Sequence, residues 1–121
     1  MKHVLVIAAA AAAIVTGICH GAEPKYDFEE IMTKGHKGKE SLLAKVLAKA
    51  ASPEEVAKLV EYHEALAQQA PPKGDAESWK QKTGALLQAS RAAKENASDE
   101  NLAKLKETSN CKACHSIHQP E

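Results

Sequence analysis

The chain has 121 residues, which is enough for one small domain and too few for two. Its 16 Lys and Arg residues balance its 16 Asp and Glu residues, so the formal net charge is zero. The charges are scattered rather than gathered in blocks, which excludes a basic nucleic-acid footprint and favours solvated helix faces. Aromatic residues make up only 3% of the chain, so its side chains alone are expected to build a modest core.

The first 22 residues have the pattern of a secretory signal peptide. A basic start at Lys2 and His3 precedes an uncharged apolar run over residues 4–18, and small residues follow. The run is shorter than the ~20 apolar residues of a membrane span. We therefore predict a signal peptide over 1–22 and a periplasmic or otherwise exported domain over 23–121, with no membrane span after cleavage. A retained anchor is the alternative.

The rest of the chain shows helical periodicity interrupted by turn residues, with no alternating strand pattern. A first helix is predicted over residues 26–50, with its apolar residues at helical spacing. Gly35 and Gly38 weaken its middle by about 1 kcal/mol each relative to Ala, and they allow a bend or a close approach there.

Three further helices have clear start signals. Ser52 is an N-cap, Pro53 suits the first helical position, and Glu55 completes a capping box. Asp75 is expected to cap the third helix, which runs to about residue 94. Ser98 is expected to cap the fourth, which continues into the cysteine segment. Four amphipathic helices with short loops predict an all-α fold, an antiparallel four-helix bundle.

One motif points to chemistry. Residues 111–115 read Cys-Lys-Ala-Cys-His, the C-x-x-C-H signature of covalent haem attachment. Because residues three apart share a helix face, both thiols can reach the vinyl groups along one haem edge. We expect one covalent haem c on Cys111 and Cys114, with His115 as the proximal iron ligand.

Other uses of the cysteines fit less well. A redox dithiol usually opens a helix in a βαβ setting, and no strand is predicted. A zinc site needs about four ligands, and no second cysteine or histidine pair has ligand spacing. A disulfide between cysteines three positions apart would close almost no loop. Cys19 lies in the leader, where the bulky Ile18 before it disfavours a lipoprotein site.

A C-x-x-C-H motif near the C-terminus, after three predicted helices, resembles the class II cytochromes c: the cytochrome c prime family and its low-spin relatives. The layout covers the whole mature chain, but only residues 111–115 are a specific match. The resemblance implies a four-helix bundle with a haem packed among the helices near one end. The chain is short and has His118 and Gln119 where members often have an aromatic and then a basic residue, which indicates a divergent branch.

The resemblance also implies which residue lies on the far side of the iron, opposite His115. Cytochromes c prime place an apolar residue of the first helix there, leaving a five-coordinate iron that binds nitric oxide or carbon monoxide. Low-spin relatives use a methionine and carry electrons. Met32 is the only methionine after the leader and is the expected sixth ligand, with core packing as its alternative role. His36, on the same side, is the alternative ligand. His63 is expected to be packed and hydrogen-bonded.

The expected function is therefore electron transfer between redox protein partners, and not enzymatic catalysis, since no catalytic constellation is visible. A five-coordinate protein that binds nitric oxide or carbon monoxide is the alternative, and a haem-free dithiol protein is a third. A homodimer remains open, because class II bundles often dimerise. Several lysines could form a basic rim that steers an acidic partner, although an ordinary solvated face is favoured: Lys34, Lys37, Lys39 and Lys112.

Overall fold

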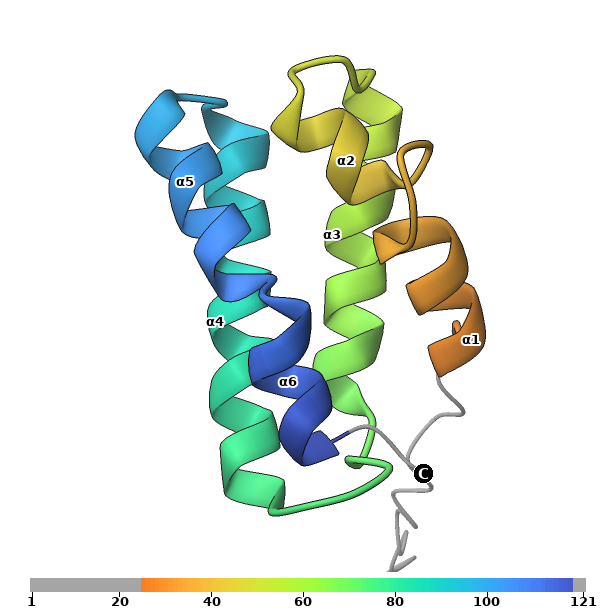
Figure 1. Ribbon diagram of the computed structural model, residues 1–121. Coiled ribbons are helices and arrows are strands. Elements are labelled where there is room, and N and C mark those ends of the chain that lie inside the picture. Colours follow the sequence, from red (N-terminus) through yellow and green to blue (C-terminus); the bar gives the residue numbers. More distant parts are fainter. Residues whose placement is uncertain (1–24, 119–121) are drawn as a thin grey trace, which may run out of the picture.

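The computed structural model describes residues 25–118, and this part of the chain is helical without strands (Figure 1). The predicted all-α class is confirmed. The predicted signal peptide, residues 1–22, lies outside the described residues. In chain order the elements are α1 (Phe28–Glu30), the π-helical η1 (Ile31–His36), α2 (Leu42–Leu47), α3 (Pro53–Gln68), α4 (Ala76–Glu95), α5 (Asp99–Thr108) and α6 (Cys111–His118).

The helices α3 and α4 run antiparallel, side by side, and form the centre of the fold (Figure 1). Both begin where the sequence predicts. The Ser52 and Glu55 capping box is complete at the start of α3, and the Asp75 carboxylate accepts a hydrogen bond from Ser78 N at 3.0 Å. The Trp79 indole closes the turn between them by donating to Gln69 O at 2.7 Å.

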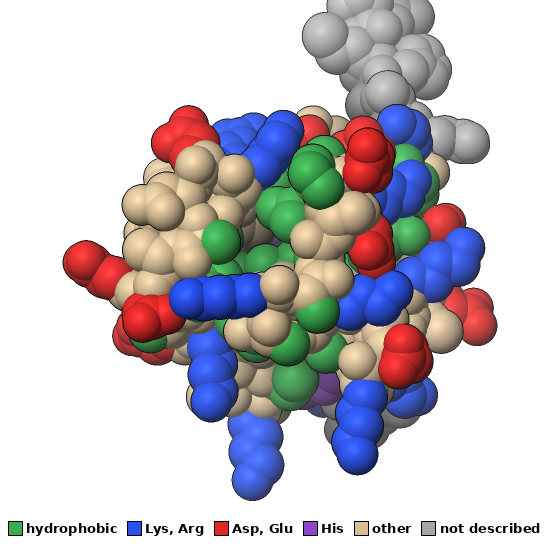
Figure 2. All heavy atoms as spheres, turned by 90° about the horizontal axis from the view of Figure 1, so that it is seen from above, with side chains coloured by type: hydrophobic (Ala, Val, Ile, Leu, Met, Phe, Trp, Pro, Cys, Tyr) green, Lys and Arg blue, Asp and Glu red, His purple; other side chains and the backbone are tan. Residues whose placement is uncertain are grey.

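The core lies between this pair and the other helices. Large apolar side chains from η1, α3 and α5 are completely excluded from solvent, and each contributes roughly 1.5–3 kcal/mol of stability by its burial: Ile31, Leu59 and Leu105. Seen from the end where α3 and α5 begin, hydrophobic side chains gather between the helices, while acidic and basic side chains surround them (Figure 2).

The segment predicted as one helix over 26–50 is broken instead. The η1 turn ends at His36, and a non-helical stretch precedes α2. Lys37 is already extended, and Gly38 after it has a φ of +87°, in the left-handed region that favours glycine, so the chain leaves the helix here rather than bending within it. Gly35 provides the expected close approach, because a Cβ there would lie 3.1 Å from Cδ2 of Tyr62 on α3.

The fourth predicted helix is also broken, directly before the cysteine motif. α5 ends at Thr108 and α6 begins at Cys111. The Asn110 side-chain oxygen accepts hydrogen bonds from the backbone N–H groups of Lys112 at 3.1 Å and Ala113 at 3.2 Å. Asn110 thereby serves as the N-cap of a new helix, a role in which Asn is strongly preferred.

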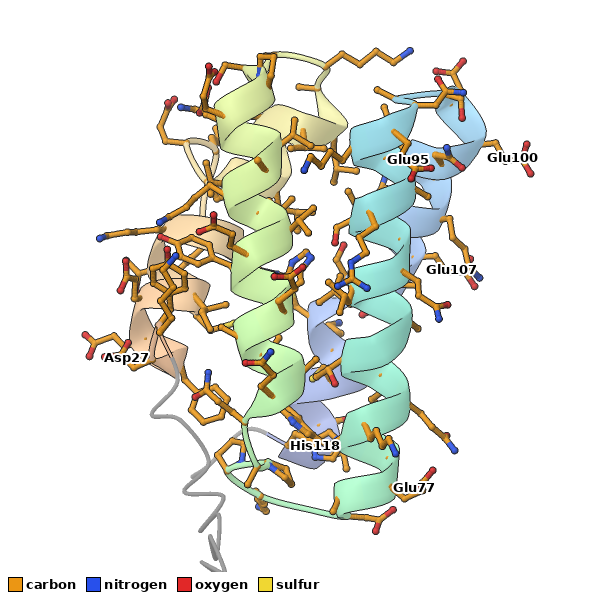
Figure 3. All side chains as sticks on the ribbon, turned by 180° about the vertical axis from the view of Figure 1, so that it is seen from behind. Asp27, Glu77, Glu95, Glu100, Glu107 and His118 are labelled. Atoms are coloured by element: carbon orange, nitrogen blue, oxygen red, sulfur yellow. The ribbon has the colours of Figure 1, made fainter. Side chains whose placement is uncertain are left out.

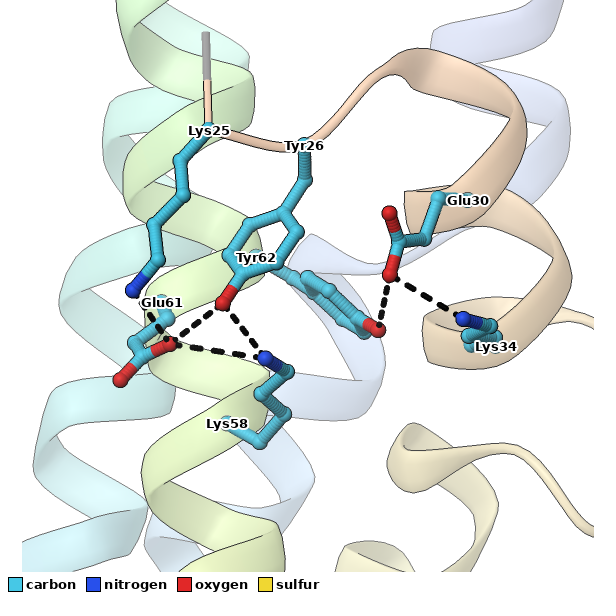
Figure 4. A network of polar contacts seen from close by, with 7 residues as sticks. All are labelled: Lys25, Tyr26, Glu30, Lys34, Lys58, Glu61 and Tyr62. Atoms are coloured by element: carbon cyan, nitrogen blue, oxygen red, sulfur yellow. Dashed lines mark hydrogen bonds and ion pairs between the residues drawn. The ribbon is translucent and has the colours of Figure 1, made fainter.

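A polar network holds the start of the described chain against α3 (Figure 4). The Tyr26 hydroxyl donates to Glu61 at 2.9 Å, and Lys58 donates to the same hydroxyl. The Tyr26 ring packs edge-on against Tyr62 with centroids 4.8 Å apart. Because exposed ion pairs contribute only about 0–1 kcal/mol each, the two buried tyrosine rings provide most of this attachment.

Within residues 25–118 no helix combines the length and the apolar content that a membrane crossing requires.

Candidate haem site

A cavity of about 610 Å³ lies between η1 and α6, with α4 forming part of its wall. Its volume falls within the roughly 300–1,000 Å³ of small-molecule and cofactor pockets. Apolar side chains from several elements line it: Phe28, Leu66, Pro72, Trp79 and Leu86. An apolar, partly enclosed space of this size suits a flat hydrophobic ligand.

The cysteine motif borders this cavity from α6. The residues of the motif that line it are Cys111, Cys114 and His115. Both cysteines lie within α6, three residues apart, so they share one face of the helix. Both described cysteines are free thiols. Burial raises the pKa of the half-buried Cys114 thiol, which keeps the thiol protonated and weakens it as a nucleophile for disulfide exchange.

The η1 turn also borders the cavity, where Met32 and His36 line it. Lys37 N donates to Met32 O at 2.8 Å, which is the i→i+5 hydrogen bond of a π-helix. The wide turn directs Ile31 into the core and Gly35 onto α3 while leaving Met32 and His36 on the cavity side. Such turns often occur at functional sites, and nothing in the helical periodicity of the sequence predicted this one.

His36 does not stand alone. Its Nε2 lies 2.9 Å from Nε2 of His63 on α3, which is completely buried. Burial, and secondarily the nearby His115, lowers the pKa of His36 to about 4, so its ring is neutral at pH 7. The expectation that His63 is packed and hydrogen-bonded is confirmed for Nε2, but its buried Nδ1 has no hydrogen-bond partner among the described residues.

His118 also borders the cavity, but both its ring nitrogens are engaged. Nδ1 donates to Lys73 O at 2.7 Å, and Nε2 accepts from the Ser78 hydroxyl at 3.2 Å. The side chain is 1% exposed and lies between the neighbouring ends of α3 and α4, whereas acidic residues such as Glu77 point outward (Figure 3). His118 therefore anchors the end of α6 and offers no free nitrogen. The sequence indicated only that this position departs from the family pattern.

Gly74 makes this anchoring possible. It has a φ of +86°, and a Cβ at this position would lie 2.7 Å from Ile117 O and 3.0 Å from Nδ1 of His118. Only glycine lets the α3–α4 turn adopt this conformation so close to α6.

The predicted lysine rim is only partly assembled at the cavity. Of its four members, Lys37 lines the cavity, while Lys34 pairs with Glu30 at 3.2 Å. Lys82 of α4, which the sequence did not single out, is a second lysine in the lining.

The part of the chain that the structure describes contains no group of three or more His, Cys, Asp or Glu side chains arranged to bind a bare metal ion. Comparisons with protein-family models, with curated proteins and with solved structures found no match for this chain.

Proposed function

We propose that the chain is an exported monohaem c-type cytochrome that carries single electrons between redox protein partners. Cys111 and Cys114 would hold haem c, His115 would be the proximal ligand, and Met32 would be the sixth ligand. One observation carries the proposal: the C-x-x-C-H residues and Met32, far apart in the sequence, border one apolar cavity.

The residues around the cavity fit a haem. Two free thiols on one helix face match covalent attachment along one edge. The imidazole of His115 and the thioether of Met32 line the same cavity, and these groups are common ligands of low-spin haem iron. The lack of a three-residue metal cluster among the described residues is compatible with an iron whose other ligands come from the macrocycle.

The arrangement of helices supports the family resemblance. The described chain can be counted as four arms (Figure 1). The first is α1, η1 and α2 together, the second is α3, the third is α4, and the fourth is α5 and α6 together. We infer that this is a divergent form of the class II cytochrome c bundle, with the haem near one end.

The iron supplies the one-electron chemistry. The chain's own residues would attach the group, fix its axial ligands and keep water away from its faces. Phe28 and Leu66, with Trp79, would supply the apolar contacts, and Lys37 and Lys82 would place positive charge beside the cavity. A positive rim increases the association rate with an acidic partner most strongly at low ionic strength.

The test is the optical spectrum of the matured holoprotein, oxidised and reduced, for wild type, Met32→Ala and Thr33→Ala. Thr33 borders the same cavity but offers no ligand sulfur, so it is the matched control. We expect a low-spin spectrum with a far-red sulfur-to-iron band that only Met32→Ala removes. A low-spin spectrum unchanged by Met32→Ala would assign the ligand to His36. A high-spin spectrum that shifts with carbon monoxide would make gas binding the function.

A further inference from the structure

The histidine pair behind the η1 turn has no role in the site as described above. His63 belongs to the regular helix α3 and is 0% exposed, and among the described residues its side chain makes one hydrogen bond, the 2.9 Å contact between its Nε2 and Nε2 of His36. An isolated buried imidazole is costly, because a buried polar group needs a partner. The contact with His36 is therefore the only polar stabilisation that His63 receives from the described residues.

The pair determines the direction of Nε2 in His36. His36 borders the cavity, but His63 does not. The Nε2 atom of His36 is consequently directed at α3 rather than into the cavity. Nε2 is also the ring nitrogen farthest from the backbone, and so the one with the longest reach toward a bound group.

Nε2 of His36 is occupied by the hydrogen bond whichever of the two histidines donates it. If His63 donates, the Nε2 lone pair of His36 accepts that hydrogen bond. If His36 donates, its Nε2 carries the proton and has no lone pair. In neither case can Nε2 of His36 bind a metal while the pair is intact.

We propose that His63 is a positioning residue that selects the sixth haem ligand: by holding Nε2 of His36 on α3, it leaves that coordination position to Met32. The inference rests on the proposed function, since it concerns the ligand choice of the same haem. Rotation of His36 into the cavity would leave both ring nitrogens of His63 buried without a partner, which opposes the exchange.

The experiment compares holoprotein variants by their far-red sulfur-to-iron band and their midpoint potential. In His63→Leu the released His36 should replace Met32, so the band disappears and the potential falls, because methionine ligation raises the potential. His63→Gln can still hydrogen-bond with His36 and should keep the band. His36→Ala is the control and should keep it as well. The double variant His63→Leu/His36→Ala should regain the band.

Two results would overturn the inference alone: a band that persists in folded His63→Leu, or a band still missing from the double variant. A wild-type protein without the band would instead overturn the ligation by Met32 on which the inference depends.

If His63→Leu does not fold, one measurement needs no substitution. In the reduced, diamagnetic wild-type holoprotein, ¹⁵N NMR should detect a scalar coupling between the two Nε2 nuclei across their hydrogen bond. The absence of that coupling would mean that the pair does not form when haem is bound, and the inference would then be wrong.

Discussion

The α3–α4 pair and the two outer arms of the chain are built differently. The helices α3 and α4 are unbroken over 16 and 20 residues, and a side-chain cap opens each. The outer arms are interrupted, one by the η1 turn and the stretch after it, the other at Ser109 and Asn110. Every residue proposed to attach the haem covalently or to ligate its iron lies in the outer arms, whereas Leu66 of α3 and Trp79 of α4 would only contribute apolar contacts. The regular pair provides the scaffold, and the interruptions direct the functional side chains into the cavity.

The largest expected effect lies in the outer arms. Cys111→Ala/Cys114→Ala removes both attachment points, so the exported protein should carry no covalent haem, as a haem stain on a denaturing gel would show. Lys112→Ala lies within the same motif but removes no attaching group, and it should stain like the wild type. A stained double variant would refute covalent attachment through this motif.

Core substitutions in the central pair, α3 and α4, should lower the stability of the protein rather than prevent haem attachment. Leu59 of α3 is 0% exposed, and Leu59→Ala should lower the free energy of unfolding by about 2–5 kcal/mol, because it leaves a cavity in the core. Ile117 is 41% exposed, so Ile117→Ala should change stability by less than about 0.5 kcal/mol. Urea unfolding curves of the two variants measure the contrast. Equal losses would mean that α3 is not the centre of the core.

The same contrast explains what the sequence could predict. Three helix starts could be predicted because an N-cap signal depends only on residues within one helical turn. The structure has side-chain caps at all three predicted positions, Ser52, Asp75 and Ser98. Asn110 is a cap residue too, but the helical spacing of Leu102 and Leu105 suggested that the helix continues. The sequence therefore contained a cap residue at Asn110, but the helical spacing of the apolar residues before it favoured one continuous helix.

The candidate site was predictable only as separate residues. The spacing of the cysteines and the histidine is sufficient to identify the motif that begins at Cys111. The sequence also placed Met32 and His36 on one face of a helix. The contact of His36 with His63 depends on how closely η1 approaches α3, which Gly35 permits by packing against Tyr62. This contact is tertiary, so no pattern along the chain could have indicated it.

A third prediction compares the caps of the two regions. Ser52→Ala and Asn110→Ala each remove one N-cap and should each lower the free energy of unfolding by about 1 kcal/mol. Asn110 also borders the cavity and begins α6, so Asn110→Ala should in addition perturb the haem spectrum, whereas Ser52→Ala should not. If both spectra stay unchanged, the break before α6 does not position the motif.

The smallest effect concerns an ion pair that joins the two regions. Lys45 of α2 donates to Glu55 of α3 at 2.8 Å, and this hydrogen bond lowers the pKa of the Glu55 carboxyl below its ordinary value. A carboxyl whose pKa is lower in the folded state binds its proton more readily in the unfolded state. Its contribution to stability is therefore complete above the ordinary pKa, near 4.5, and is lost as the pH falls through the lower folded value.

Glu55→Gln separates this ion pair from the capping box, because glutamine at that position can still complete the box. Stability differences between wild type and Glu55→Gln, measured by urea unfolding, should be small at pH 7. They should shrink toward zero as the pH falls below the ordinary value of about 4.5 and through the lower folded pKa of Glu55. A difference that stays constant across this range would come from a weakened cap rather than from the charge. In that case α2 would be attached to α3 by its apolar contacts alone, through Leu43 and Val46 of the core.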